Sequence, residues 1–266
     1  MTFRDFLKEN IVILDGGMGT LLQARGLTPG EMPERWCLSH PEIITEIHRA
    51  YYDAGSNVVS TNTFGASLLK LSPEELDAIV GAAVACAREA AATSTREGSK
   101  FVALDIGPSG KLLRPLGDLD FEDAVTIFAE TVKLGVKYGA DLIIIETMND
   151  SYETKAALLA AKENSSLPVF VTNAYGEDGK LMTGATPAAM VAMLEGLGAD
   201  AIGANCSLGP DQLRSVIKEL LSCASVPVIL KPNAGLPKVV NGATVYDVDA
   251  EAFAESVTDL VKAGVR

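Results

Sequence analysis

The chain has 266 residues, and its 22 Lys and Arg residues against 35 Asp and Glu residues give a net charge of −13. This acidic balance excludes the electrostatic footprint of a protein that binds nucleic acid or an anionic membrane surface. With 48% hydrophobic residues the sequence supports a large core, but no apolar run reaches the ~18 residues of a membrane helix, and the mixed charges of residues 1–10 are unlike a signal peptide.

Seven short runs rich in Val, Ile and Leu predict β-strands. They are almost continuously apolar, which is typical of strands covered on both faces of a parallel sheet. They begin near Ile11, Asn57, Phe101, Leu142, Pro168, Ala201 and Pro227. Helical patterns separate them, for example over Pro41–Ala54 and from Thr186 to Gly198. This alternation predicts an α/β protein whose functional residues gather at the carboxyl ends of the strands.

A weak repeat indicates the number of strands. Small-residue turns that contain Gly55, Gly139 and Gly198 lead from helices into strands, and the same pattern recurs at Gly264. The strand starts are 46, 44, 41, 26, 33 and 26 residues apart, so an eighth start falls near residue 264. We therefore expect residues 1–266 to form a single domain, a (β/α)8 TIM-type barrel truncated before strand eight. The stretch 239–249, with Asn241-Gly242, predicts a turn or short hairpin rather than a domain boundary.

The first predicted strand ends in the glycine-rich turn Asp15-Gly16-Gly17-Met18-Gly19-Thr20. Such a turn exposes backbone N–H groups that bind an anion, although a plain strand-to-helix connection explains it equally well. The spacing lacks the G-x-G-x-x-G fingerprint of dinucleotide sites, and no phosphate-binding loop follows anywhere. A small carboxylate therefore fits this turn better than a nucleotide.

Three further strand ends carry reactive or charged side chains. Glu146 follows a buried run, where a carboxylate requires a ligand ammonium or a structural Arg as its partner. Cys206, next to Asn205, is either a ligand or nucleophile or a small packing residue. Lys231 offers a rival chemistry, because a desolvated lysine at this position forms Schiff bases.

The remaining polar residues and cysteines have simpler interpretations. Thr61-Asn62-Thr63 and Asp105 are site candidates whose alternative is hydrogen bonding within the barrel mouth. The two histidines, His40 and His48, lie in or before the second helical segment, so a histidine-based site is not expected. Three cysteines are expected to be structural: Cys86 packs in a helix, Cys223 lies near a helix end and Cys37 lies in a loop beside Trp36. The four cysteines are far apart and form no C-x-x-C pair, as expected for thiols in a reducing cytoplasm.

Taken together, six segments in order along the chain resemble the homocysteine S-methyltransferase family. They are 14–20 (LDGGMGT), 60–65 (STNTFG), 105–110 (DIGPSG), 146–147 (ET), 203–206 (GANC) and 232–235 (PNAG). The stretches 106–117 and 205–210 look most like the cobalamin-dependent methionine synthase branch of that family. In that branch this barrel is the amino-terminal homocysteine-binding domain, and folate-binding and cobalamin-binding modules follow on the same chain or on partner proteins.

The resemblance implies a chemistry and a set of residues. Zinc held by three protein thiolates binds the homocysteine sulfur and keeps it deprotonated, so that the thiolate attacks the methyl group of methylcobalamin and gives methionine. Cys206 corresponds to the first zinc ligand and is the catalytic residue that we expect here. The expected homocysteine-binding residues are Asp15, Gly16, Gly17, Met18, Thr61, Glu146, Asn205 and Asn233, with Asn233 at or beside the open metal position.

The sequence departs from the family in one respect. The family's other two zinc thiolates come from a Gly-Gly-Cys-Cys motif at the end of strand eight, and this chain contains no such motif. We therefore expect this chain to be poor in zinc and inactive alone. The open barrel would leave strand edges that favour self-association.

Two alternatives to this function stay open beside the Lys231 chemistry. One is a stand-alone homocysteine methyltransferase that uses S-methylmethionine or another small donor. The other is a zinc-free binding or assembly module, in which Cys206→Ala changes nothing measurable.

Overall fold

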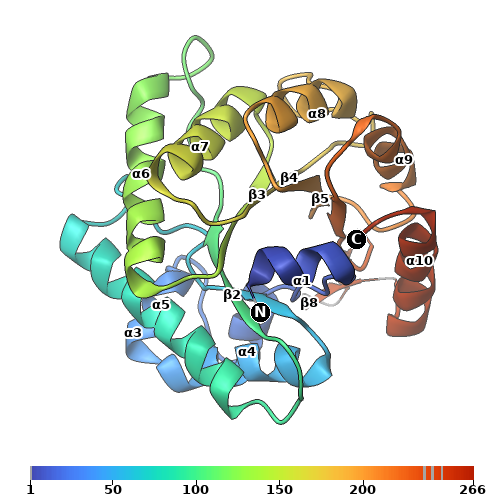
Figure 1. Ribbon diagram of the computed structural model, residues 1–266. Helices are drawn as coiled ribbons and strands as arrows, with labels where there is room; N and C mark the ends of the chain where they lie inside the picture. Colours follow the sequence, from blue (N-terminus) through green and yellow to red (C-terminus); the bar gives the residue numbers. More distant parts are fainter. Residues whose placement is uncertain (1, 236–237, 241–242, 247) are drawn as a thin grey trace.

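The computed structural model describes residues 2–235, 238–240, 243–246 and 248–266. Six parallel strands pair with their neighbours in chain order and curl into a half-barrel, with the longer helices outside it (Figure 1). The strands are β1 (Val58–Ser60), β2 (Phe101–Ile106), β3 (Leu142–Met148), β4 (Val169–Asn173), β5 (Ala201–Asn205) and β6 (Val228–Lys231). This α/β architecture agrees with the predicted class.

The helices alternate with the strands along the chain. They are α1 (Phe3–Glu9), α2 (Gly19–Ala24), a 3₁₀ turn (Pro33–Arg35), α3 (Trp36–Ser39), α4 (Pro41–Ala54), α5 (Pro73–Thr93), α6 (Phe121–Tyr138), α7 (Ser151–Asn164), α8 (Pro187–Gly196), α9 (Arg214–Cys223) and α10 (Ala250–Ala263). The predicted helix over Pro41–Ala54 is confirmed residue for residue. Gly55 and Gly139 end α4 and α6 with φ of 125° and 83°, a conformation that favours glycine.

The first predicted strand forms only in part, so over the described residues the sheet has six strands rather than the seven expected. Within Ile11–Gly16, Leu14 makes an isolated parallel bridge to Val58, and Asn57 N–H donates to Ile13 O over 2.7 Å. Ile13 is 54% exposed. The run pairs with β1 on one side only, so its ladder stays too short to count as a strand. The other six strands begin within one residue of their predicted starts.

A groove separates this first run from β6. It has a volume of about 310 Å³ and apolar walls, with side chains from the first run, from β6 and from α10, among them Phe253 and Val257. Arg266 N–H donates to Val228 O over 2.9 Å, so the end of the described chain already lies beside β6. The half-barrel is thus open between residues 11–14 and β6.

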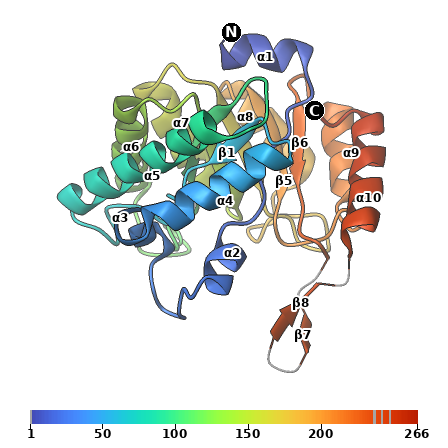
Figure 2. The same ribbon diagram turned by 90° about the horizontal axis from the view of Figure 1, so that it is seen from below.

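Helix α1 covers the amino-terminal end of the barrel. The ring of Phe3 lies 5.0 Å from that of Phe101 and 5.4 Å from that of Phe170, and all three side chains are buried. Figure 2 shows α1 at one end of the molecule and α2 at the opposite end. The aromatic cluster closes the end of the barrel that is remote from the carboxyl ends of the strands.

The predicted hairpin after β6 is present. Strands β7 (Lys238–Val240) and β8 (Ala243–Val245) pair antiparallel and project beyond the barrel at the same end as α2 (Figure 2). The predicted turn residues Asn241 and Gly242 lie outside the described residues.

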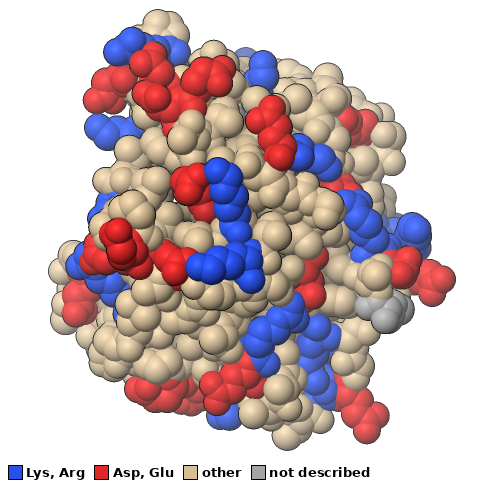
Figure 3. Space-filling model, turned by 60° about the vertical axis from the view of Figure 1, so that its left-hand side comes forward, with Lys and Arg blue, Asp and Glu red and all other residues tan. Residues whose placement is uncertain are grey.

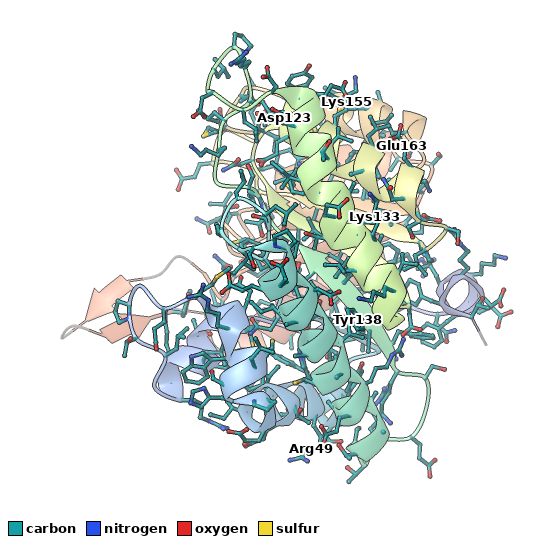
Figure 4. All side chains as sticks on the ribbon, turned by 90° about the vertical axis from the view of Figure 1, so that its left-hand side faces the viewer. Arg49, Asp123, Lys133, Tyr138, Lys155 and Glu163 are labelled. Atoms are coloured by element: carbon teal, nitrogen blue, oxygen red, sulfur yellow. The ribbon has the colours of Figure 1, made fainter. Side chains whose placement is uncertain are left out.

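The outer helical faces are charged. Lys and Arg are interspersed with Asp and Glu on the face in Figure 3, and Asp123 and Lys133 lie on the outer side of α6 in Figure 4. Lys133 pairs with Glu130 over 2.7 Å. Among the described residues, no helix combines the length and apolar character that crossing a bilayer requires.

The contact between β5 and β6 predicts a strong effect of one methyl group. A Cβ added to Gly203 would lie 1.9 Å from the backbone oxygen of Ile229, which has no room to move within the ladder. We expect Gly203→Ala to lower the free energy of unfolding by at least about 2 kcal/mol through overpacking. Urea unfolding followed by circular dichroism measures this change.

Gly196→Ala is the matched control, because a Cβ on Gly196 meets nothing within 4 Å. In a helix this substitution leaves stability unchanged or raises it by up to about 1 kcal/mol. Equal stability of the two variants would contradict the close approach of β5 and β6.

Candidate functional site

The carboxyl ends of the strands surround a cavity of about 340 Å³. All nine site residues predicted from the sequence line it, and so do other polar, charged and aromatic residues from the same loops. The lining is Asp15, Gly16, Gly17, Met18, Gly19, Pro33, Glu34, Ser60, Thr61, Asn62, Phe64, Asp105, Glu146, Thr147, Asn205, Cys206, Lys231, Pro232 and Asn233. The structure therefore brings together residues from almost the whole length of the chain.

A buried cation lies between two carboxylates on one side of this cavity. Lys231 Nζ is 2.9 Å from Glu146 Oε2 and 3.4 Å from Asp15 Oδ1. The side chains are only 17%, 12% and 4% exposed, respectively. Burial alone lowers the pKa of Lys231, but the charges of Glu146 and the two aspartates outweigh it and raise that pKa above its usual value. Lys231 therefore stays protonated, which opposes its role as a Schiff-base nucleophile.

Asp15 is held from a second side by β1. Its carboxylate accepts the N–H of Ser60 over 2.7 Å and the hydroxyl of Ser60 over 3.1 Å. Burial raises the pKa of Asp15, and the Lys231 charge and the Ser60 hydrogen bonds counteract part of that rise. The predicted carboxylate at the end of the first run is thus fixed by three donors of the protein itself.

Glu146 enters the cavity because β3 is irregular at this point. The pairing of β3 with β4 shifts register between Ile145 and Met148, and Thr147 has a φ of 62°. Such bulges re-aim a side chain relative to the regular alternation of a strand. The sequence left a ligand ammonium or a structural arginine as the partner of Glu146, and the cation that the structure places beside it is Lys231.

Asp105 differs from the other two carboxyl groups. Its side chain is 6% exposed, and its Oδ1 atom has no hydrogen-bond partner. Burial first and the charge of Glu146 second raise the pKa of Asp105 well above its usual value. A buried polar atom without a partner marks a place where a ligand can bond.

Asn205 joins three strand ends. Its Oδ1 accepts the N–H of Thr147 and the hydroxyl of Thr172, both over 2.8 Å, while its Nδ2 donates to Thr147 Oγ1 over 2.7 Å. These three hydrogen bonds of the amide side chain connect β3, β4 and β5. Similarly, the hydroxyl of Thr61 bonds to Thr63 Oγ1 and to the N–H of Asp105, over 2.8 and 3.1 Å. These bonds match the structural alternative for Thr61.

Cys206 follows β5 in a left-handed conformation. Its φ is 56°, that of Ser207 is 54°, and its N–H donates to the backbone oxygen of Lys231 over 3.0 Å. The thiol is half-buried at the cavity. Left-handed backbone at residues other than glycine costs on the order of 1–3 kcal/mol each and is concentrated at functional sites.

The glycine turn and the loop that contains Asn233 both line the cavity, and backbone contacts hold each of them in place. A Cβ on Gly16 would lie 2.8 Å from the hydroxyl of Tyr51, and that hydroxyl donates to Gly17 O over 2.8 Å. Gly16 therefore permits close packing of the turn on α4. The N–H of Asn233 donates to Leu208 O over 3.1 Å, which fixes the loop after β6.

From the sequence no role was assigned to Glu34, Ser60 or Phe64, although Ser60 and Phe64 lie in the segment 60–65 that resembles the family. Glu34 is buried and accepts the N–H of Gly65 over 2.5 Å from a short 3₁₀ turn. Its loop carries no motif of its own, so no signal identified it. Ser60, in contrast, precedes the polar cluster at the end of β1, and its position next to Thr61 was the available signal.

The other cysteines and the histidines lie away from the cavity lining. Cys37 is buried in the short helix α3 rather than in the loop that we expected, because residues 36–39 continue the preceding 3₁₀ turn. Cys86 is buried in α5 as predicted, and Cys223 is exposed at the end of α9. His48 is fully buried in α4, and burial lowers its pKa to about 4. Within the described ranges, no three His, Cys, Asp or Glu side chains are arranged to hold a metal ion.

The comparisons with known proteins agree with one another. A family model described as homocysteine S-methyltransferase matches residues 12–266. The methionine synthase of Mycobacterium leprae (strain TN) is 30% identical over 271 residues, which cover 96% of this chain and 22% of that protein. That of Mycobacterium tuberculosis is 30% identical over 274 residues, which cover 97% and 23%. The chain thus spans less than a quarter of the length of these curated relatives.

A solved structure shares the fold. The metallated form of the homocysteine methyltransferase MmuM from Escherichia coli superposes with a TM-score of 0.83 at 23% identity, and the match covers 99% of this chain and 92% of that one.

The four thiols differ in burial, and this difference predicts which of them react. Burial raises the pKa of Cys37 to about 12 and also raises that of Cys86, so neither forms the thiolate that alkylating reagents attack. We expect iodoacetamide to modify Cys206 and Cys223 in the native protein, and all four cysteines in urea. Peptide mass mapping after a short pulse measures this pattern. The variant Cys223→Ser removes the other reactive thiol, so that the labelling rate of Cys206 is measured alone. A rate for Cys206 as slow as that of Cys37 would contradict an accessible thiol in the cavity.

Proposed function

The chain belongs to the homocysteine S-methyltransferase family, and from this premise we propose that the cavity binds L-homocysteine for methylation to methionine. One observation carries the proposal: two buried carboxylates, a turn of backbone amides and a thiol line the same cavity. Homocysteine has three groups that complement them, an ammonium, a carboxylate and a thiol. In barrels of parallel strands, the active site lies at the carboxyl ends of the strands, which is where this cavity is found.

The amino-acid end of the ligand would lie on the side of Asp15 and Glu146. These carboxylates hold two negative charges against the single positive charge of Lys231, which leaves one charge for a ligand ammonium. The N–H groups of residues 16–18 would donate hydrogen bonds to the ligand carboxylate. The unpartnered oxygen of Asp105 adds a further bonding position in the same cavity.

The thiol end would then reach toward Cys206. A homocysteine thiol is nucleophilic only as its thiolate, so the reaction requires that its proton be removed before methyl transfer. In the family this is the task of zinc held by three thiolates. Among the residues that the structure describes, Cys206 is the one thiol in the cavity lining, and no three-donor cluster surrounds it. These residues alone do not fit such a zinc ion.

The missing donors and the open groove have one common explanation. We propose that the domain is a (β/α)8 barrel whose further strand occupies the groove between residues 11–14 and β6 and brings the thiolates of a Gly-Gly-Cys-Cys motif to Cys206. The apolar walls of the groove and the bond from Arg266 N–H to Val228 O support this proposal. If that strand is absent, a second copy of the chain is the other candidate to occupy the groove. Sedimentation equilibrium would detect the resulting dimer.

The methyl donor follows from the same premise. The 30% identity to two methionine synthases supports methylcobalamin, carried with folate by further modules of a cytoplasmic protein. A side-by-side assay with methylcobalamin and S-methylmethionine separates this donor from the stand-alone alternative.

The two carboxylates predict how homocysteine binding responds to mutation. Glu146→Gln removes the negative charge that the ligand ammonium needs, so we expect affinity for L-homocysteine to fall about tenfold or more, as for other hydrogen bonds to charged groups. Isothermal titration calorimetry measures this loss. Binding of 4-mercaptobutyrate, which lacks the ammonium, should change little.

Glu163→Gln, on the exposed side of α7 (Figure 4), is the matched control and should bind as the wild type does. A wild-type protein that binds no homocysteine would refute the proposed function. Equal losses for both ligands would refute the role of Glu146 alone.

The donor set predicts the zinc content. We expect the 266-residue chain to carry far less than one zinc per molecule, with or without homocysteine, and a version extended along its native gene to carry about one, as for a closed site of several thiolates. Elemental analysis after dialysis measures both, and Cys206→Ala in the extended version should lose the metal.

Two other results would change the proposal. Equal zinc in both versions would mean that this chain builds its site from other ligands. Zinc in neither would favour the zinc-free assembly module.

A further inference from the structure

We propose that Phe64 is a further ligand-binding residue, whose ring covers the hydrocarbon chain of the bound amino acid, and that Gly107 is the positioning residue for this ring. The inference rests on the proposed binding of L-homocysteine. It deepens that function, because it assigns a contact to the methylene groups of the ligand, whereas the roles proposed above concern its charged groups and its thiol. It also gives a joint role to two of the segments that resemble the family, 60–65 and 105–110.

The ring of Phe64 lies at the solvent side of the cavity. Phe64 is 40% exposed, whereas the side chains of Lys231 and of its two carboxylate partners are at most 17% exposed. These ion pairs therefore form the floor of the cavity, and the ring lies at its mouth. Among the described lining residues, Phe64 carries the single aromatic side chain. A ligand whose ammonium binds at the floor therefore lies between the charges and this ring.

The hydrocarbon part of the ligand needs an apolar contact. L-homocysteine has two methylene groups between its amino-acid end and its thiol, whereas most of the lining residues are glycines or carry charged or polar side chains. Burial of methylene groups against an apolar surface is favourable, and an aromatic ring offers a large surface of this kind. The ring of Phe64 therefore provides a contact that the charged groups of the cavity cannot.

Gly107 fixes the ring from behind. The N–H of Gly107 donates to Phe64 O over 2.9 Å, and a Cβ added to Gly107 would meet three carbons of the Phe64 ring at 2.6, 2.6 and 2.7 Å. The ring therefore packs directly on the glycine backbone. The N–H of Ser109 donates to the buried Glu153 carboxylate over 2.8 Å, so the segment that carries Gly107 is held in place. A methyl group added at this glycine must therefore move the ring rather than the backbone.

The test separates contact with the hydrocarbon chain from contact with the charged groups. We expect Phe64→Ala to weaken the binding of L-homocysteine about tenfold, which is the effect of two methylene groups that lose their apolar contact. 4-Mercaptobutyrate lacks the ammonium but keeps the thiol and the methylene groups, so its binding should weaken as much. Glu146→Gln, in contrast, is expected to affect L-homocysteine alone. Isothermal titration calorimetry measures both ligands.

Gly107→Ala tests the position of the ring, because it displaces the ring without removing it. We expect this variant to lose affinity for both ligands as Phe64→Ala does. In the Phe64→Ala background the same substitution should have no further effect, because the ring that it displaces is absent. The two losses are therefore not additive, as for residues in direct contact. Additive losses would contradict the positioning role of Gly107.

Two further variants separate the contact from a general disturbance of the loop. Phe64→Leu keeps an apolar side chain at the mouth of the cavity and should retain part of the affinity that Phe64→Ala loses. Leu116→Ala is the matched control, because Leu116 is also an exposed apolar residue of a loop, at 66%, but lies outside the cavity lining. We expect this control to bind both ligands as the wild type does.

The outcomes distinguish this inference from the function on which it rests. A Phe64→Ala protein that binds both ligands as the wild type does would overturn the inference and leave the proposed function intact. A loss confined to L-homocysteine would also overturn it, because the ring would then act on the amino-acid end of the ligand. A wild-type protein that binds neither ligand would refute the proposed function, and this inference with it.

Discussion

The site depends on the ion pairs of Lys231 with Glu146 and Asp15. Moving three charges out of water is costly, and their attraction offsets that cost only when the atoms meet at hydrogen-bond distance. Lys231 and Glu146 are 85 positions apart in the chain. The two groups therefore meet only if β3, β4, β5 and β6 keep their registers, so that the pairing of the sheet and the electrostatics of the cavity support each other.

The parallel sheet supplies that accuracy through its ladders. Asn205 is the register partner of Lys231 across β5 and β6, and the next residue, Cys206, donates its N–H to Lys231 O. Lys231 thus contacts both sides of the cavity. Its backbone oxygen bonds to Cys206, and its side chain pairs with the two carboxylates. A shift of β6 by one residue would turn the Lys231 side chain to the opposite face of the sheet and separate both connections.

Much of this arrangement follows from the sequence, because it depends on local patterns. Continuous apolar runs located six strands to within one residue, and Gly55 and Gly139 marked helix ends that need a left-handed residue. The rule that parallel strands present their carboxyl ends together also predicted that Asp15, Glu146 and Cys206 would share a site.

The remainder depends on distances between segments that are remote in the sequence. The run at Ile11 has the composition of a strand, but a ladder needs a partner, and β1 is its single neighbour among the described residues. Lys231 was noted as a nucleophile because its isolated position at a strand end does not reveal two carboxylates beside it. Likewise, the burial that leaves an oxygen of Asp105 without a partner arises only when β1, β2 and β3 are assembled.

Backbone strain at the strand ends completes this relation between sheet and site. Thr147 and Cys206 both adopt left-handed φ values, at 62° and 56°, directly where β3 bulges and β5 ends. Asn205 binds the backbone and the hydroxyl of Thr147 at the same time, and Cys206 N–H is held by β6. These bonds keep the two residues out of the regular strand geometry. The same departure turns Glu146 toward Lys231 and places the Cys206 thiol at the cavity, so the bonds that maintain the strain also set the direction of both functional side chains.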